Sequence, residues 1–297
     1  MGPVEKTLVR LSGPYDLALS LKAAASFSQI GSEFKPVLRK AVRIMERSSI
    51  IEIRQVSLDP AIIEISTKQS DHKAQVNKLA QWIVLADLDL HPFYERVSED
   101  PVLSRVVKQL HGLKPMRPAS LFEMAVVAVT EQQISMLAAE KIRSRLVERF
   151  GEKIEELWLF PSPQALGRAS LDDLTACGLS KRKAEYIQGL AQRVIEGSLD
   201  LEQLKTMSND EVQSVIGDIR GFGRWSADYI LIRGLGRPDV VPVDDLGIRT
   251  FTGKYFGSGS RMSAKEVAKA FEPYAPFRGI AMFYLMVHNR LGMKEME

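Results

Sequence analysis

The stretch that most constrains the fold of this chain runs from residue 208 to residue 233, where two short helix-like segments flank Gly221, Phe222 and Gly223. Two glycines around one apolar residue allow a tight turn and a close approach to the backbone. The second segment begins near Arg224, directly after the turn. The pattern therefore predicts a helix-hairpin-helix unit.

Such a hairpin is suited to binding phosphate groups. The first backbone N–H groups of the second helix have no partner inside the helix, so they point outward and can bind a phosphate oxygen. Contacts of this kind position DNA without reading its sequence. The alternative is a plain helical corner with glycines at the cap. On the DNA-binding interpretation, the contacts come from Gly221, Phe222, Gly223, Arg224 and Ser226.

A basic run, Lys181 to Lys183, opens another helix-like segment. It could add phosphate contacts, and the alternative is a solvated helix face. The net charge of +3 permits a nucleic-acid partner without requiring one, because a local patch matters more than the total charge.

Composition narrows the class of protein. With 297 residues, 45% hydrophobic and 26% charged, the chain is expected to fold as a globular protein of two or three lobes. Cys177 is the only cysteine, which excludes a disulfide framework and a four-cysteine iron-sulfur cluster within the chain. The four histidines lack metal-ligand spacing, so we expect no metal site. The start lacks a secretory signal and the longest apolar run, 280–287, is too short to span a bilayer, so we expect an intracellular, cytoplasmic protein.

The apolar periodicity changes near residue 90. Before that point, β-branched runs at 8–11, 50–56 and 62–65 predict strands of a small sheet, and helical spacing at 16–27 and about 74–86 predicts helices. After it, helical spacing dominates. We therefore predict an α+β fold with a small antiparallel sheet and helices, followed by a two-lobed all-helical core. The predicted domains are an α+β domain at 1–90, a helical domain at 119–236, and a second helical lobe built from 91–118 and 237–297.

Helix ends are marked by capping residues. Ser120, Ser170 and Ser208 each precede an acidic residue by three positions, which is typical of a helix start. Glycines follow helical runs at 151, 197 and 217, where the left-handed conformation of a helix end is accessible to glycine.

A second segment follows the hairpin at a set distance. Residues 242–247 read Pro-Val-Asp-Asp-Leu-Gly, and 20 residues separate Trp225 from Asp245. Together with the Gly-Phe-Gly-Arg-Trp of the hairpin, this segment resembles the helix-hairpin-helix superfamily of DNA glycosylases, and within it the 3-methyladenine DNA glycosylase II family. The resemblance extends to Gly-Pro-Tyr-Asp at 13–16, Glu-Gln-Gln-Ile-Ser at 131–135 and Pro-Phe-Arg-Gly at 276–279.

The resemblance implies excision of alkylated bases from double-stranded DNA, the first step of base excision repair, by a monomer. Bifunctional relatives carry a lysine at the Trp225 position, where it forms a Schiff base with the sugar. Because Trp225 cannot do this, we expect no strand cleavage. Other relatives bind an iron-sulfur cluster through four cysteines, which this chain lacks. The alternatives are a non-catalytic DNA-binding protein and a glycosylase for a different damaged base.

The catalytic group of this family is an aspartate, whose charge stabilises the developing positive charge on the sugar or orients the attacking water. The family pattern places it directly before Leu-Gly, which selects Asp245, whereas the Val-Asp pattern of more distant relatives selects Asp244. We expect Asp245 to be catalytic. We expect Asp244 to cap the helix that follows.

The flipped base needs a pocket with aromatic walls. Trp225 and Tyr229 lie four residues apart and so share one helix face, where their rings can also serve simply as core packing. Met286 and Arg290 resemble pocket positions of the family, with Met286 in place of a frequent aromatic. An indole face suits the positive charge of N-alkylated purines.

Base flipping leaves a gap in the duplex that an inserted side chain holds open. Gln132 and Gln133 are the candidates, although relatives often carry an apolar residue at the second position. Arg278 matches a family arginine, either as a DNA contact or as a structural ion pair. The resemblance also suggests a monovalent cation at backbone carbonyls of the hairpin, and no other cofactor is expected.

Overall fold

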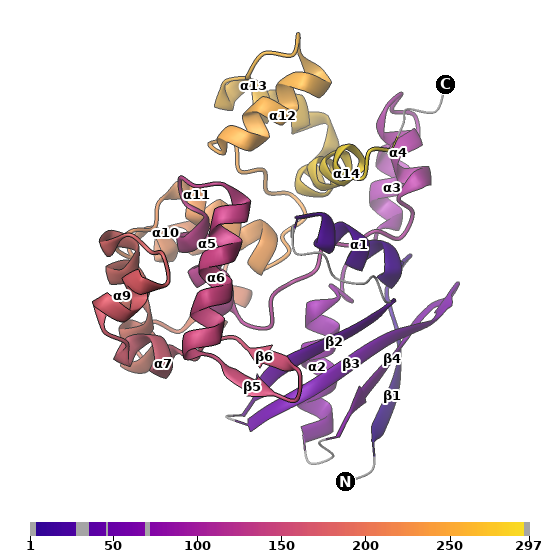
Figure 1. Cartoon of the computed structure of the whole chain (residues 1–297). Coiled ribbons are helices and arrows are strands. Elements are labelled where there is room, and N and C mark those ends of the chain that lie inside the picture. Colours follow the sequence, from indigo (N-terminus) through magenta and orange to yellow (C-terminus); the bar gives the residue numbers. More distant parts are fainter. Residues whose placement is uncertain (1–3, 28–35, 46, 69–71, 294–297) are drawn as a thin grey trace.

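The computed structural model describes residues 4–27, 36–45, 47–68 and 72–293. The chain begins as a small sheet with two helices and continues as a long succession of helices (Figure 1). This agrees with the predicted α+β class, a sheet domain followed by a helical core. No helix in these described ranges is both long and apolar enough to cross a membrane.

The sheet has four antiparallel strands in the order β1-β4-β3-β2. Three of them fall where β-branched runs predicted strands, while the edge strand β2 was missed. Its basic residues, Arg39, Lys40 and Arg43, interrupt the apolar signal, and charged residues are typical of an edge strand. The strands are β1 (Glu5–Arg10), β2 (Val37–Ile44), β3 (Arg47–Leu58) and β4 (Ala61–Thr67).

Helices α1 (Leu17–Phe27) and α2 (Lys73–Ile83) follow β1 and β4 and coincide, to within a few residues, with the two predicted helical stretches. The alternating buried positions Ile51, Ile53, Ile63 and Ile65 of the sheet pack with buried residues of α2 in one hydrophobic cluster. Because side chains alternate between the two faces of a strand, one face of the sheet packs into this core.

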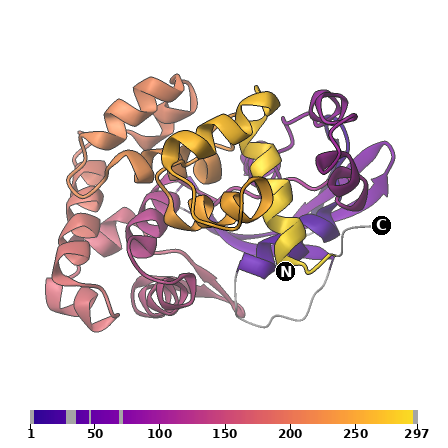
Figure 2. The same ribbon diagram turned by 90° about the horizontal axis from the view of Figure 1, so that it is seen from above.

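The remaining helices form two further groups, each with its own core. One cluster draws its buried residues from 121–240 and the other mainly from 90–113 and 248–287. Seen from above, the C-terminal helices (yellow) lie between the helices of the first group, pink to orange on the left, and the purple N-terminal part on the right (Figure 2). The helices are α3 (His91–Arg96), α4 (Leu103–Gln109), α5 (Leu121–Glu131), α6 (Met136–Phe150), α7 (Pro163–Arg168), α8 (Leu171–Ala176), α9 (Lys181–Ile195), η2 (Leu201–Lys205), α10 (Asn209–Gly217), α11 (Arg224–Tyr229), η3 (Ile230–Gly234), α12 (Leu246–Phe256), α13 (Ala264–Phe271), η4 (Glu272–Tyr274) and α14 (Arg278–Arg290).

The three predicted serine caps are confirmed. Ser120, Ser170 and Ser208 each accept a hydrogen bond from the backbone N–H three residues on. The glycine stops are confirmed only in part. Gly197 has a left-handed φ of 72°, whereas Gly151 caps α6 in extended conformation and Gly217 is the last helical residue of α10. Those two ends therefore do not depend on the conformation that only glycine adopts cheaply.

A short hairpin, β5 (Glu152–Ile154) and β6 (Leu157–Leu159), was also missed by the sequence interpretation. It joins the helices to the sheet through ion pairs, with Arg43 of β2 bonded to Glu152 at 3.2 Å and Lys68 to Glu155 at 2.7 Å. Strands of three residues carry too little periodicity to be recognised in a sequence.

Candidate active site

The predicted helix-hairpin-helix is formed by α10 and α11, and α11 continues through the π-helical turn η3. Gly221 has a φ of 92°, and a Cβ there would lie 2.3 Å from ring atoms of Tyr186. Both facts require glycine at this position. Gly223 differs, because its backbone is extended and a Cβ would meet no atom within 4 Å. The surface in front of Gly223 is therefore open to a close approach by another molecule.

Two of the five hairpin residues predicted to contact DNA, Phe222 and Ser226, have side chains that turn inward. Phe222 is buried in the helical core, and Ser226 is 2% exposed with its hydroxyl accepting from Gln132 Nε2 at 3.2 Å. The Phe222 side chain anchors the turn and that of Ser226 lies on the buried face of α11. A DNA contact of these two residues therefore stays a prediction for their backbone groups. The Arg224 side chain stays 62% exposed and pairs with the buried Asp228 at 3.2 Å.

Asp228 is a hairpin residue that sequence reasoning missed. Its carboxylate accepts from Gln213 of α10 at 2.7 Å and from Arg224, and so ties the two helices of the hairpin together. Burial raises the pKa of Asp228, while the neighbouring Arg224 opposes the rise. The only signal in the sequence was an acid four residues after an arginine.

Asp245 stands at the start of α12, with both carboxylate oxygens held. Oδ1 accepts from the backbone N–H of Ile248 at 2.8 Å, and Oδ2 accepts from the indole Nε1 of Trp225 at 2.7 Å. Asp245 is therefore the N-cap of α12, and the prediction that Asp244 has this role is wrong. Asp244, one residue earlier, is exposed in the turn that leads into the helix. The two bonds fix the plane of the Asp245 carboxylate beside the hairpin.

Trp225 and Tyr229 share one face, as predicted, and their rings stack. The ring centroids are 4.9 Å apart and the ring planes differ by 14°. The Tyr229 hydroxyl donates to the Glu131 carboxylate and accepts from Arg233, so it is held from both sides. Burial is the main reason that the pKa of Tyr229 is raised to about 12. Tyr229 therefore stays neutral, and keeps its proton, across physiological pH.

Glu131 is a further residue of this cluster that was not predicted as a site residue. It ends α5, its side chain is 8% exposed, and it pairs with Arg143 at 2.8 Å and Arg233 at 3.8 Å. A buried carboxylate of this kind needs such partners. The partners come from α6 and η3, so no local pattern in the sequence could identify the cluster.

The predicted residues of α14 reach different neighbours. Arg290 donates to the backbone carbonyl of Ser26 at 3.2 Å and to the sulfur of Met136 at 3.3 Å. Met286, one turn earlier, is half-buried against the second helical cluster. Arg278 forms a bidentate ion pair with Asp239, in which Arg278 Nε donates to Asp239 Oδ1 at 2.8 Å. Arg278 thus makes the structural ion pair that was one of its two interpretations.

The turn between α5 and α6 separates the two glutamines. Gln132 points inward and donates to the carbonyl oxygen of Gly221 at 2.9 Å as well as to Ser226. Gln133 is exposed and has a left-handed φ of 55°. Of the two glutamines, Gln133 thus has the side chain that is exposed, whereas that of Gln132 is held against the hairpin, and the choice between them as insertion residue stays a prediction.

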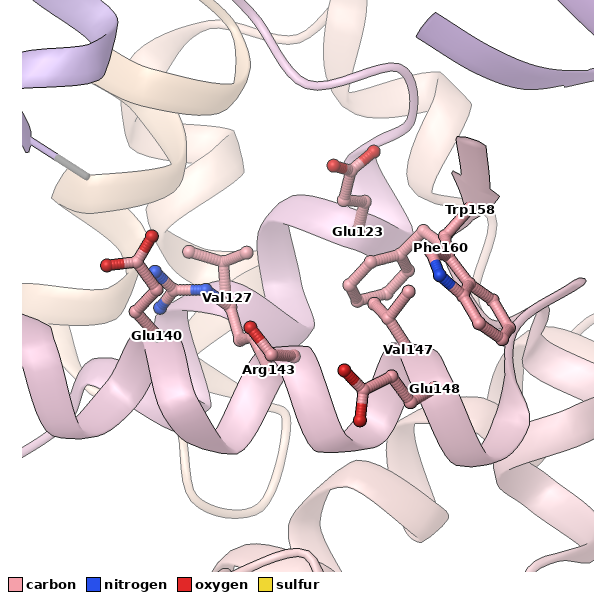
Figure 3. Close-up of a pocket in the computed structure, with 9 residues that line it drawn as sticks. Glu123, Val127, Glu140, Arg143, Val147, Glu148, Trp158 and Phe160 are labelled. Carbon is pink, nitrogen blue, oxygen red and sulfur yellow. The ribbon is translucent and has the colours of Figure 1, made fainter. Parts of the chain in front are cut away.

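A groove of about 330 Å³ lies between α5, α6 and β6 (Figure 3). Val127, Val147, Trp158 and Phe160 form its apolar part, and three glutamates surround it. Neither Trp225 nor Asp245 lines this groove. Arg143 belongs to its lining and also pairs with Glu131, and so connects the groove with the cluster around Tyr229.

Comparison with known proteins identifies a family and several relatives of this chain. Residues 126–276 match the family described as HhH-GPD superfamily base excision DNA repair protein. A DNA-3-methyladenine glycosylase of Bacillus subtilis is 29% identical over 84% of this chain and 85% of its own length. The solved 3-methyladenine DNA glycosylase of Archaeoglobus fulgidus is 25% identical, with a TM-score of 0.82 over 97% of this chain and 100% of its own. That of Schizosaccharomyces pombe, solved with abasic DNA, is 28% identical, with a TM-score of 0.60 over 69% of this chain and 100% of its own.

Proposed function

This chain belongs to the HhH-GPD superfamily of base excision DNA repair proteins, and we propose that it hydrolyses the N-glycosidic bond of alkylated bases in double-stranded DNA. The observation that carries the proposal is the Asp245 carboxylate, held by the Trp225 indole and by the first turn of α12 beside the phosphate-binding hairpin. The relatives named as 3-methyladenine glycosylases support alkylated bases as the substrate class.

In the proposed reaction, the bond between the sugar C1′ and the base nitrogen breaks, and both bonding electrons leave with the base. Positive charge then develops on the sugar, and the Asp245 carboxylate stabilises it electrostatically. Water supplies the new C1′–O bond, and its proton is released. Because both Asp245 oxygens are held in place before the reaction, little reorganisation is needed when the charge appears.

The lesion itself contributes to selectivity. An N-alkylated purine carries positive charge, which weakens the glycosidic bond and favours contact with an electron-rich ring face. The stacked Trp225 and Tyr229 provide such a surface next to Asp245. Arg290 and Met286 of α14 are the proposed remaining pocket residues.

We also propose that the reaction stops at base removal. Strand cleavage by this mechanism needs an amine that forms a Schiff base with the sugar. Trp225 occupies the position where bifunctional relatives carry that lysine, and its nitrogen donates to Asp245. We further propose that the protein acts inside the cell as a monomer. A monovalent cation at the backbone carbonyls of the hairpin is also part of the proposal.

DNA is engaged through two elements. The open backbone at Gly223 and the exposed Arg224 approach a phosphate, and Gln133 enters the gap left by the flipped nucleotide. The complex of the Schizosaccharomyces pombe relative with abasic DNA supports DNA as the partner.

A panel of duplexes, each with one lesion, tests the proposal. Suitable lesions are 3-methyladenine, 7-methylguanine, hypoxanthine and 1-methyladenine, with release of free base measured by chromatography. We expect release of at least one alkylated base, an intact strand until alkali is added, and no adduct after borohydride treatment. DNA binding without release from any lesion would instead favour a non-catalytic DNA-binding protein.

A further inference from the structure

The turn that joins α5 to α6 is held by a lysine from a distant helix. Lys183 Nζ donates to the backbone carbonyl of Thr130 at 3.0 Å and to that of Gln132 at 2.6 Å. The last carbonyls of a helix have no partner inside it, and an ammonium group is a strong donor for them. Lys183 thus binds the end of α5 on one side of Gln133.

Gln133 needs this support because its φ of 55° is unfavourable for a residue with a side chain. Such a conformation persists only where surrounding contacts hold it. Two contacts do so here. Lys183 binds the carbonyl of Gln132, and the Gln132 amide binds the carbonyl of Gly221 in the hairpin.

The same contacts distinguish Lys183 from its basic neighbours. Lys181 and Arg182 are exposed, whereas Lys183 is half-buried, and burial lowers the pKa of Lys183. Its ammonium donates to two carbonyls of the turn. Phosphate contacts and a solvated helix face were the two interpretations of the run Lys181 to Lys183, and the ammonium of Lys183 is instead engaged by the turn.

We propose that Lys183 is a positioning residue for base flipping, an inference that rests on the proposed function. Lys183 holds Gln133 in the conformation that enters the DNA and links the Gln133 turn to the hairpin. A side chain that is fixed before binding loses less conformational freedom when it enters the duplex. Without the lysine, the turn relaxes and Gln133 is presented in many conformations.

The test compares Lys183→Met with Lys108→Met, which removes the same charge from an exposed position on α4. The first measurement is fluorescence of 2-aminopurine placed beside an abasic site, at saturating protein, because it reports insertion without requiring base excision. The second is the single-turnover excision rate on an alkylated duplex. The third is the salt dependence of affinity.

We expect Lys183→Met to lose most of the fluorescence change and to lower the saturated rate about tenfold, the loss expected for a charge-assisted hydrogen bond. Its salt dependence should equal that of the wild type, because no phosphate contact is removed. Lys108→Met should match the wild type throughout. A Lys183→Met protein with unchanged fluorescence and a salt slope smaller by about one would identify a phosphate contact and overturn the proposal.

A double-mutant cycle with Gln133→Ala tests the link directly. If Lys183 acts through Gln133, then Lys183→Met has no further effect on fluorescence or rate in the Gln133→Ala background. Additive effects would contradict the proposal. Lys183→Gln, which keeps an amide donor, provides the same comparison should Lys183→Met not fold. If the wild-type protein inserts into DNA but releases no base, the proposed function fails while the role of Lys183 remains measurable.

Discussion

Replacing Trp225 by Phe isolates one contact of the proposed catalytic carboxylate. The variant keeps an aromatic ring to stack on Tyr229, where the centroids are now 4.9 Å apart, and removes the indole N–H that donates to Asp245 Oδ2 at 2.7 Å. The bond from the Ile248 backbone to Oδ1 remains. Asp245 therefore stays attached to α12 and loses only the donor that fixes its second oxygen.

The expected magnitude follows from the chemistry of that bond. A hydrogen bond to a charged group contributes about 1.5–3 kcal/mol. Trp225 and Asp245 are both half-buried, so water replaces part of the lost bond and the lower end of this range applies. A loss of about 1.5–2 kcal/mol in transition-state stabilisation lowers the excision rate about 10- to 30-fold.

The assay is the single-turnover rate of base release at saturating enzyme, with affinity for abasic DNA measured in parallel. We expect the rate of Trp225→Phe to fall and its affinity to stay near that of the wild type, because the hairpin backbone is unchanged. Trp158→Phe, an exposed tryptophan on β6, serves as the matched control. A wild-type rate for Trp225→Phe would refute the inference that the indole orients Asp245.

Three further outcomes are expected. Gly221→Ala should lower both the free energy of unfolding and the affinity for DNA, because Gly221 has a φ of 92° and a Cβ there would meet the Tyr186 ring. Gly223→Ala should lower the affinity alone, since a Cβ there meets no atom of the protein within 4 Å. Equal denaturation midpoints for the two variants would contradict this expectation. Burial lowers the pKa of Lys114 to about 8, so the folded protein loses this proton before the unfolded chain does. Relative to Lys114→Met, the free energy of unfolding should therefore rise from pH 8 toward 10.5 by about 1.4 kcal/mol per unit, and urea denaturation that shows no such slope would refute the shift. Borohydride should trap no protein on DNA with the wild-type chain, and a trapped adduct would show an amine nucleophile elsewhere.

The sequence was most informative where one residue type is required by backbone geometry. The left-handed Gly221 and the reciprocal cap of Ser208 and Glu211 made the hairpin predictable, because they depend on neighbours a few positions away. The spacing from Trp225 to Asp245 likewise indicated the pair that the structure joins by a hydrogen bond. Local chemistry of this kind leaves a pattern in a single sequence.

What could not be predicted depends on contacts between distant segments. Glu131 receives its partners from α6, α11 and η3, and Lys183 reaches a turn 51 residues away from it. Adjacent residues with the same side chain, Gln132 and Gln133, differ only in which one points toward the hairpin. The helix cap was predicted at Asp244 and lies at Asp245. A shift of the helix start by one residue is enough to exchange the orientations of these two side chains, and sequence patterns do not fix helix ends to one residue.

The most direct test of the account is Asp245→Asn on a duplex with one alkylated base. Asparagine retains an oxygen for the Ile248 N–H and so still caps α12, but its amide then meets the Trp225 N–H as a second donor and the negative charge is gone. We predict that Asp245→Asn folds, binds abasic DNA and releases base at least about 100-fold more slowly than the wild type, the scale of losing one preorganised electrostatic contact. The control variant Asp244→Asn should remain active. Wild-type base release by Asp245→Asn, or its loss in Asp244→Asn alone, would contradict the account.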